Sequence, residues 1–227
     1  MTDYTKEERE LAKKLKTVEL FSGSKSFSKV AKELGHTTYT VDNNPDCEPD
    51  LVFNLLENDW PKDLDYALKY ADVIWMSPPC NKLSLVTGNK YWTADRQPRT
   101  DEADEARQLL LICQRLADWA DKEGKIYFIE NPRARARWFL PETTRQTVWY
   151  CQYGDNRAKP TDIWTNLQGW KAKTCKNNNL NCHHERAKRG SKTGTQGLSN
   201  AKTRGQIPKD LFTELFNQMK KDIEVRG

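Results

Sequence analysis

Short apolar segments that end abruptly in turn-forming residues constrain the fold of this chain more than any other feature. Their composition and spacing predict buried β-strands at 17–21, 38–41, 51–53, 71–76 and 125–129. Apolar residues recur at helical spacing over 27–34 and 101–121, and each of these stretches is followed by a glycine, a common helix-ending residue. Strands that alternate with helices predict an α/β fold with a mostly parallel sheet covered on both faces.

The connection after the first predicted strand is suited to a ligand. In the stretch 18–34, VELFSGSKSFSKVAKEL, small residues at the strand end let the backbone approach a ligand, and the helix N-terminus favours anionic groups. Asp42, at the tip of the second strand, can take the hydroxyl groups of a ribose. Because Gly23 is the one glycine in this turn, an ordinary strand-to-helix connection is the alternative interpretation.

A cysteine follows the fourth predicted strand in the sequence Ser77-Pro78-Pro79-Cys80. Ligands of open parallel sheets bind outside the carboxyl ends of the strands, where this thiol is expected to lie. Two prolines stiffen the turn and set the direction of the thiol, which a nucleophile requires. The alternative is an inert, buried cysteine after a proline turn.

Glu130-Asn131-Pro132 stands just past the fifth predicted strand. A carboxylate there can hydrogen-bond the amidine-like edge of a base, and burial would raise its pKa so that it could also donate a proton. The alternative is an ordinary acidic residue at a turn. Basic residues follow, and they either bind phosphates and a pyrimidine oxygen or form a solvated face. These residues are Arg133, Arg135, Arg137, Arg157 and Lys159.

Positive charge is concentrated in the last third of the chain. Residues 151–227 contain 15 Lys and Arg against 7 Asp and Glu, a net charge of +8, whereas 1–150 contain 22 against 25, a net charge of −3. This asymmetry indicates either a polyanionic partner at that end or a solvated basic tail. The charged start is not typical of a signal peptide, and no apolar run approaches the roughly 20 residues that a membrane span needs.

We therefore expect a cytosolic protein whose six cysteines are thiols or metal ligands rather than disulfides. Cys175, Cys182, His183 and His184 fall within ten residues of a polar segment that lacks a core of its own, a composition that predicts a zinc site. Cys151 is a candidate for a further ligand. The alternative is a flexible loop that contacts DNA.

Four motifs gain meaning from their order along the chain. FSGSKSF, SPPC, ENP and YGDNRAKP occur in the order and spacing of DNA (cytosine-5)-methyltransferases, and the chain resembles the short phage and prophage type of this family over about 17–166. The resemblance implies a Rossmann-like fold that binds S-adenosylmethionine. It also implies methyl transfer to C5 of a flipped cytosine in DNA, through a covalent cysteine adduct.

The resemblance assigns roles residue by residue. Cys80 matches the nucleophile, Glu130 the acid that binds cytosine, and Arg157 with Lys159 the polar run that steadies the flipped base. The positions that match the cofactor site are Phe21, Ser22, Gly23, Lys25, Ser26, Asp42, Asn43, Asn54, Leu55 and Pro78.

The chain also departs from the family pattern. Lys25-Ser26 replaces a Gly-Gly pair, Asp42 replaces a Glu, Asn54-Leu55 replaces Asp-Ile, and Pro132 replaces a Val. A Gln-x-Arg-x-Arg pattern survives only as Arg157-x-Lys159, and a separate target-recognition domain is missing. Three alternatives therefore stand beside the main hypothesis: transfer of a modified one-carbon group such as carboxymethyl, an RNA substrate, or an inactive DNA-binding protein.

The sequence predicts four regions: a charged N-terminal helix at 1–16, a methyltransferase core at 17–166, a basic loop-rich lobe at 167–206 with the zinc candidate, and a C-terminal helix at 207–227 that packs on the core. We expect a monomer that binds DNA and no membrane. The resemblance to phage proteins predicts a phage or prophage origin and a location in the cytoplasm of a bacterial host.

Overall fold

A seven-stranded sheet forms the centre of the protein, which we describe from a computed structural model for residues 14–186 and 205–226. The strands are β1 (Lys16–Leu20), β2 (Thr37–Asp42), β3 (Leu51–Val52), β4 (Val73–Met76), β5 (Ile126–Pro132), β6 (Arg145–Trp149) and β7 (Pro160–Thr165). The described α-helices are α2 (Ser26–Glu33), α3 (Lys62–Tyr70), α4 (Asp101–Lys122) and α6 (Lys209–Arg226).

The order of the strands identifies the topology. They lie in the order β3-β2-β1-β4-β5-β7-β6, in which the first five are parallel and β7 runs antiparallel to both β5 and β6. The parallel part has the strand order of a Rossmann fold, and its topological switch point lies between β1 and β4. The predicted Rossmann-like α/β fold is therefore confirmed.

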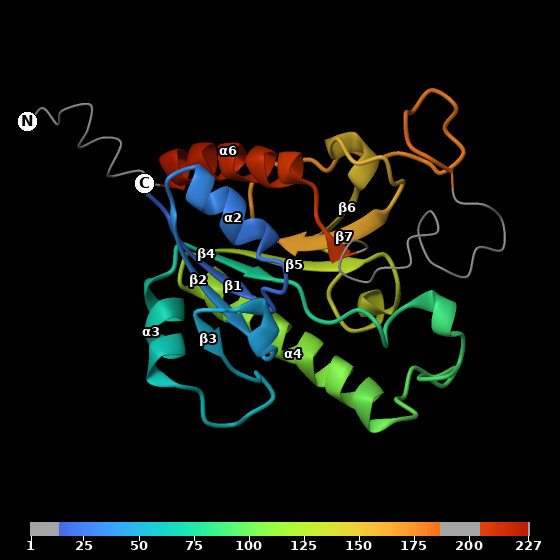
Figure 1. The fold of residues 1–227 in the computed structure, drawn as a ribbon, viewed down its shortest axis with the longest axis horizontal. Helices are drawn as coiled ribbons and strands as arrows, with labels where there is room; N and C mark the ends of the chain where they lie inside the picture. Colours follow the sequence, from blue (N-terminus) through green and yellow to red (C-terminus); the bar gives the residue numbers. More distant parts are fainter. Residues whose placement is uncertain (1–13, 187–204, 227) are drawn as a thin grey trace, which may run out of the picture.

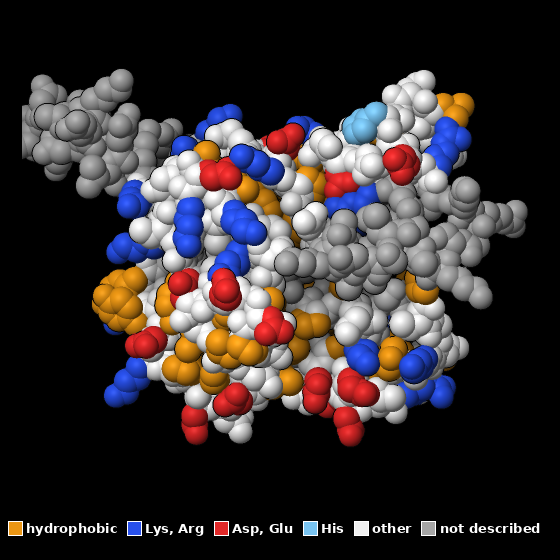
Figure 2. All heavy atoms as spheres, viewed as in Figure 1, with side chains coloured by type: hydrophobic (Ala, Val, Ile, Leu, Met, Phe, Trp, Pro, Cys, Tyr) orange, Lys and Arg blue, Asp and Glu red, His pale blue; other side chains and the backbone are white. Residues whose placement is uncertain are grey.

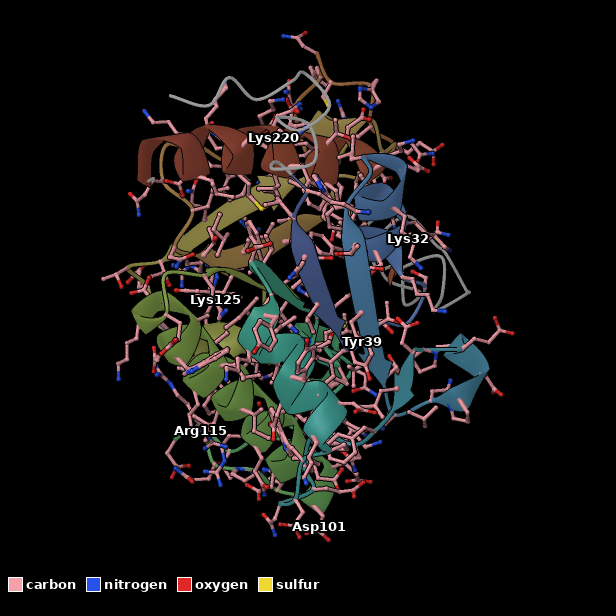
Figure 3. All side chains as sticks on the ribbon, turned by 90° about the vertical axis from the view of Figure 1, so that its left-hand side faces the viewer. Lys32, Tyr39, Asp101, Arg115, Lys125 and Lys220 are labelled. Atoms are coloured by element: carbon pink, nitrogen blue, oxygen red, sulfur yellow. The ribbon has the colours of Figure 1, made fainter. Side chains whose placement is uncertain are left out.

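Helices cover both faces of the sheet (Figures 1 and 3). On one face α2 and α6 pack against the central strands, where Phe27 of α2 stacks between Trp75 and Phe216 at ring-centroid distances of 5.3 and 5.1 Å. On the other face α3 and α4 bury Leu64, Leu68 and Leu110. Burial of each of these side chains contributes about 2 kcal/mol to the stability of the fold. These contributions explain why the short strands hold together.

Charge is unevenly distributed over the surface. On the face that Figure 2 shows, Lys and Arg side chains gather at the lower right, over the loop between β4 and α4. Acidic side chains lie beside them, where the first turn of α4 contains Asp101, Glu102 and Asp104. These acids stabilise the positive end of the α4 dipole, and Thr100 caps the helix by accepting a hydrogen bond from the Ala103 amide at 3.3 Å.

The structure adds elements that the periodicity did not predict. Helix α3 and strands β6 and β7 were missed. In β7 the polar residues Thr161 and Asp162 are buried as completely as Ile163 and Trp164, so burial leaves no apolar pattern in the sequence. Strand β5 continues through Glu130 to Pro132, so these residues belong to the strand rather than to the turn after it. Most of the predicted helix at 1–16 lies outside the described residues, and Lys16 already begins β1.

Residues 167–186 contain no helix and no strand, apart from a bridge between Arg157 and Glu185. The predicted lobe at 167–206 extends beyond them into residues 187–204, which lie outside the described part. Among the described helices, none has the length and apolar content that a transmembrane span requires.

A buried acid caps helix α2 from the neighbouring strand. The Glu19 side chain accepts hydrogen bonds from the amides of Phe27 at 3.3 Å and Ser28 at 2.9 Å, in place of a cap from Lys25. Burial raises the pKa of Glu19 to about 7, although these hydrogen bonds lower it. The sequence predicted that this helix N-terminus would favour a ligand's anionic group; instead, two of its amides already bind Glu19.

We expect the free energy of unfolding to fall as the pH rises from 4.5 to 7, relative to that of a Glu19→Gln variant. In this range the unfolded chain releases the Glu19 proton, whereas the folded protein keeps it, so rising pH favours unfolding. The raised pKa corresponds to a total loss of about 3 kcal/mol. Urea denaturation at several pH values measures the difference.

The variant Glu105→Gln, at an exposed position of α4, controls for the removal of one carboxylate. Parallel pH profiles for the wild-type protein and Glu19→Gln would contradict the prediction.

Candidate active site

The carboxyl ends of the parallel strands bring the predicted site residues to one edge of the sheet. The turn after β1, the end of β2 and the turn after β4 all lie there, on either side of the switch point. Because β7 is antiparallel to β5, its first residues reach the same edge, and Thr161 lies opposite Pro132. The start of β7 therefore meets, at this edge, turns that lie 80 residues or more before it in the chain.

Glu130 lies at the centre of this edge and is buried, with 7% of its surface exposed. The Tyr150 hydroxyl donates a hydrogen bond to Glu130 Oε1 at 3.0 Å. Burial raises the pKa of Glu130, while the nearby Lys159 ammonium and hydrogen bonds from Tyr150 and Ser77 oppose the rise. The balance favours a carboxyl group that can hold a proton nearer to neutral pH than an exposed glutamate does.

Lys159 interacts electrostatically with both Glu130 and Cys80. Burial lowers the pKa of Lys159, and the negative charges of the Glu130 carboxylate and the Cys80 thiolate oppose this lowering. Its ammonium also lies 4.9 Å from the centroid of the Tyr150 ring. Cys80 itself is exposed, in contrast to the inert buried cysteine of the alternative interpretation. The edge thus combines an accessible thiol with a buried acid and a partly buried cation.

Hydrogen bonds hold the turn that carries Cys80 against β4 and β5. The Asn131 amide group donates to the Pro78 carbonyl at 3.0 Å, and the Trp75 indole donates to the Ser77 hydroxyl at 2.7 Å. Asn131 is fully buried, so its hydrogen bond to the turn is shielded from water. The two motifs, SPPC and ENP, are therefore fixed relative to each other.

Arg157 is buried behind Tyr150. Its guanidinium forms an ion pair with Asp155, donates to the Gln206 carbonyl at 2.9 Å and lies 5.6 Å from the centroid of the Tyr150 ring. These contacts hold Tyr150 from one side, while Lys159 contacts it as well. The sequence analysis missed Tyr150 as a site residue. A tyrosine that is buried needs a hydrogen-bond partner for its hydroxyl, and this need is the one signal that could have linked it to a buried acid.

The turn after β1 has an unusual backbone that Asp42 holds in place. Phe21 and Lys25 have φ angles of 58° and 56°, in the left-handed region where side chains are rare. Asp42 accepts hydrogen bonds from the amides of Gly23 at 2.8 Å and Asn44 at 2.9 Å. The Ser22 hydroxyl is buried in this turn and has no partner among the described residues. Such strain and such an unsatisfied group are typical of a ligand site.

The other predicted cofactor residues lie around this turn. The Lys25 ammonium donates to the Glu48 backbone carbonyl, and the hydroxyls of Ser24 and Ser26 lie within hydrogen-bond distance of each other. Asn43 and Asn54 are exposed after β2 and β3, whereas Leu55 and Pro78 are buried. Asn54 accepts a hydrogen bond from the Leu56 amide at 3.1 Å and so turns the chain after β3.

Of the predicted metal ligands, the structure brings three together and leaves one out. The Cys175, Cys182 and His184 side chains meet with Cys151, the further candidate, whereas His183 lies outside the group. His183 is instead exposed, with Nε2 at 3.0 Å from the Asp155 carbonyl.

Comparison with known proteins identifies the family. A scan against family models finds no match. The chain is 30% identical over 165 residues to the "Probable DNA (cytosine-5)-methyltransferase" of Frog virus 3 (isolate Goorha), and the match covers 71% of this chain and 75% of the viral protein. The chain belongs to the DNA (cytosine-5)-methyltransferase family.

Among solved structures, a methyltransferase of Entamoeba histolytica is similar, with a TM-score of 0.48 and 14% sequence identity. That match covers 77% of this chain, which spans 58% of the length of the Entamoeba chain. The fold assignment given above rests on the strand order.

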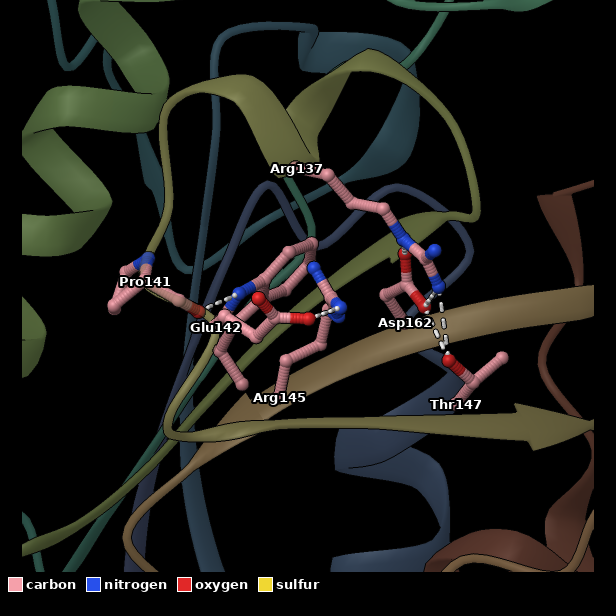
Figure 4. A network of polar contacts seen from close by, with 7 residues as sticks. Arg137, Pro141, Glu142, Arg145, Thr147 and Asp162 are labelled. Atoms are coloured by element: carbon pink, nitrogen blue, oxygen red, sulfur yellow. Dashed lines mark hydrogen bonds and ion pairs between the residues drawn. The ribbon is translucent and has the colours of Figure 1, made fainter.

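In this DNA (cytosine-5)-methyltransferase, two of the three arginines after β5 have structural contacts rather than the phosphate-binding or solvated positions considered for them. Arg135 is buried and donates to the backbone carbonyls of Ser84 and, at 2.6 Å, Gly88, which anchors the loop that follows Cys80. Arg137 binds Asp162 of β7 through two hydrogen bonds of 2.6 and 2.7 Å (Figure 4). Arg133 is exposed and lies 5.4 Å from the centroid of the Trp149 ring.

The Arg137–Asp162 pair attaches β7 to the segment after β5. Asp162 is fully buried, and it also accepts a hydrogen bond from the Thr147 hydroxyl at 2.7 Å. We expect Arg137→Met to lower the free energy of unfolding by about 3 kcal/mol, because it leaves a buried carboxylate without its cation. Urea denaturation measures the change.

Arg145→Met is the matched control, since Arg145 pairs with Glu142, whose side chain is 85% exposed (Figure 4). It should cost under about 1 kcal/mol. Equal losses in the two variants would refute the special role of the buried pair.

Proposed function

We propose that this protein transfers a methyl group from S-adenosylmethionine to C5 of a cytosine in DNA, with Cys80 as the nucleophile. Family membership supports the reaction class. The observation that carries the assignment of roles is the neighbourhood of Lys159, a partly buried cation that interacts electrostatically with both the exposed Cys80 thiol and the buried Glu130 carboxyl.

The residues of the β1 turn fit this cofactor. The Asp42 carboxylate has lone pairs left after its two backbone hydrogen bonds, and these can accept from a ribose diol. The Ser22 hydroxyl, buried and unsatisfied among the described residues, can bind a polar group of the ligand. S-adenosylmethionine, when bound, supplies an electrophilic methyl group.

Cytosine C5 becomes nucleophilic only after another group has added at C6. Thiolate is the side-chain group best suited to this addition at neutral pH, and the Lys159 ammonium is close enough to Cys80 to interact with its charge. Glu130 can donate its proton to the ring nitrogen N3 and accept a hydrogen bond from the N4 amino group. Both contacts stabilise the negative charge that addition places on the ring.

After methylation, a water molecule takes the C5 proton, the electrons of the C5–H bond re-form the C5–C6 double bond, the Cys80 sulfur leaves C6 as a thiolate, and N3 returns its proton to Glu130. In a duplex the base stack covers C5 and C6, so the cytosine must leave the stack at a cost of a few kcal/mol. Contacts with phosphates can offset this cost.

The loop that follows Cys80 supports a nucleic-acid substrate. Residues 81–100 contain four Lys and Arg against a single Asp, and this positive group is visible at the lower right of Figure 2. Lys82 and Lys90 lie 4.5 and 5.0 Å from the centroid of the Tyr91 ring. Two cations beside an aromatic ring are a common arrangement where phosphates and bases are bound.

A Lys82→Ala/Lys90→Ala variant should bind duplex DNA about tenfold more weakly, and its binding should depend less on salt, by about 1 to 2 in the log–log slope. Fluorescence anisotropy at several salt concentrations measures both quantities. The control is Lys69→Ala/Lys122→Ala, since these helix-end residues precede β4 and β5 and so lie at the opposite edge of the sheet. If the control lowers affinity equally, the loop is not the contact surface.

Cys80→Ala should lower the rate of cytosine modification by at least about 10³-fold, because addition at C6 loses its nucleophile. Purified protein is incubated with DNA and cofactor, and the nucleosides are measured by mass spectrometry. Wild-type protein should also form a covalent complex with 5-fluorocytosine DNA, which Cys80→Ala cannot form. Cys80 is exposed, so the variant should melt at the wild-type temperature.

The same mass-spectrometric measurement of nucleosides distinguishes the alternatives. Added mass of one CH₂ group on deoxycytidine supports the proposal, whereas a larger group indicates a modified cofactor and modified cytidine indicates RNA. Unmodified nucleosides together with tight DNA binding would indicate an inactive DNA-binding protein. Equal activity of wild type and Cys80→Ala would refute the role of Cys80.

A further inference from the structure

Three thiols and one imidazole from two distant segments meet beside the 3₁₀-helix η4 (Tyr150–Tyr153). Cys151 belongs to η4, whereas Cys175, Cys182 and His184 come from the irregular segment after β7. The four ligand atoms all lie within 4.8 Å of one another, and none of the three cysteines forms a disulfide. The proposed methylation chemistry uses none of these groups.

We propose that Cys151, Cys175, Cys182 and His184 bind one structural zinc ion. Zinc in structural sites takes four sulfur and nitrogen ligands in a tetrahedron, and Cys₃His is one of its usual sets. Donor atoms in such a tetrahedron lie about 3.8 Å apart when the metal–sulfur distance is about 2.3 Å. Cys175 Sγ and His184 Nδ1 are 3.9 Å apart.

The environment of His184 selects the nitrogen that would bind the metal. His184 Nε2 lies 3.1 Å from the Asn177 carbonyl, which can only accept a hydrogen bond, so Nε2 carries the proton. Nδ1 is then the deprotonated nitrogen, and it is the one that faces Cys175. A backbone carbonyl that fixes the ring in this way is typical of metal-binding histidines.

Amide groups surround the sulfur atoms. Gln152 Nε2 lies 3.6 Å from Cys182 Sγ and 3.8 Å from Cys151 Sγ, and Asn179 Nδ2 lies 3.6 Å from Cys175 Sγ. Such N–H donors stabilise sulfur in the thiolate form, which is the form that binds metal. Four protein ligands leave no position for a substrate or water, so the site is structural rather than catalytic.

The metal explains how an irregular polar segment is held in place. Leu167 and Trp170 still pack in the main core, but residues 173–186 contain no helix or strand, and the apolar cluster beneath them has a buried core of only Trp149, Cys151 and Ala158. The segment reaches the edge of the active site, where the Glu185 amide donates to the Asn156 carbonyl at 2.8 Å. Metal binding would supply the folding free energy that this small core lacks.

The test uses the full chain expressed in zinc-supplemented medium. Mass-spectrometric metal analysis should find about one zinc per chain in the wild-type protein. Cys151→Ser, Cys182→Ser and His184→Ala should lose this zinc, whereas His184→Cys should keep it. Cobalt exchanged into the wild-type site should give the visible absorption of a tetrahedral thiolate complex, and chelation should lower the melting temperature.

Two variants provide matched controls. His183→Ala removes the neighbouring imidazole, which lies outside the cluster, and Cys47→Ser removes a thiol in a different part of the fold. Both should retain one zinc per chain. The proposal is overturned if wild-type protein contains no zinc and takes up no cobalt, or if His183→Ala loses the metal as His184→Ala does. These readouts are independent of methylation, so the proposed function can fail without affecting them.

Discussion

The antiparallel pairing of β7 with β5 is the constraint on which the active edge depends. A purely parallel sheet would place the start of β7 at the opposite edge, away from Glu130. Because β7 reverses direction, Lys159 arrives beside Glu130 at the edge where Cys80 also lies. A buried carboxyl, a partly buried ammonium and an accessible thiol then interact electrostatically, which fully exposed groups at the same spacing would do only weakly.

The polar contacts around this edge explain why burying so many polar groups is tolerated. The Glu130 carboxyl binds Tyr150, Asp162 binds Arg137, and Arg135 binds two backbone carbonyls of the loop after Cys80. Each of these three buried side chains thus has at least one partner that offsets the cost of its removal from water. The same contacts hold the loop, β7 and the SPPC turn together. Stability and site geometry therefore depend on the same bonds.

The proposed zinc ion completes this arrangement at the side where the apolar core is thinnest. Its ligand Cys151 follows directly after Tyr150, and the segment that supplies the other ligands pairs with the chain next to Arg157. A metal there would fasten the polar residues of the active edge from behind, without entering it. The β1 turn has a different device, since Asp42 binds the backbone on which the cofactor is proposed to lie.

Much of this protein could be predicted from its sequence by itself. Apolar periodicity determined the parallel strands and the helices α2, α4 and α6, because burial of a strand or a helix face leaves a local pattern. It also placed Cys80 and Glu130 at strand ends. Only the tertiary structure decided the direction of β7 and the hydrogen bond between Tyr150 and Glu130. It also decided the structural roles of Arg135 and Arg137, and that Cys151 rather than His183 belongs to the cluster of candidate metal ligands. These contacts join segments far apart in the chain, and no local spacing encodes which of several similar side chains will meet.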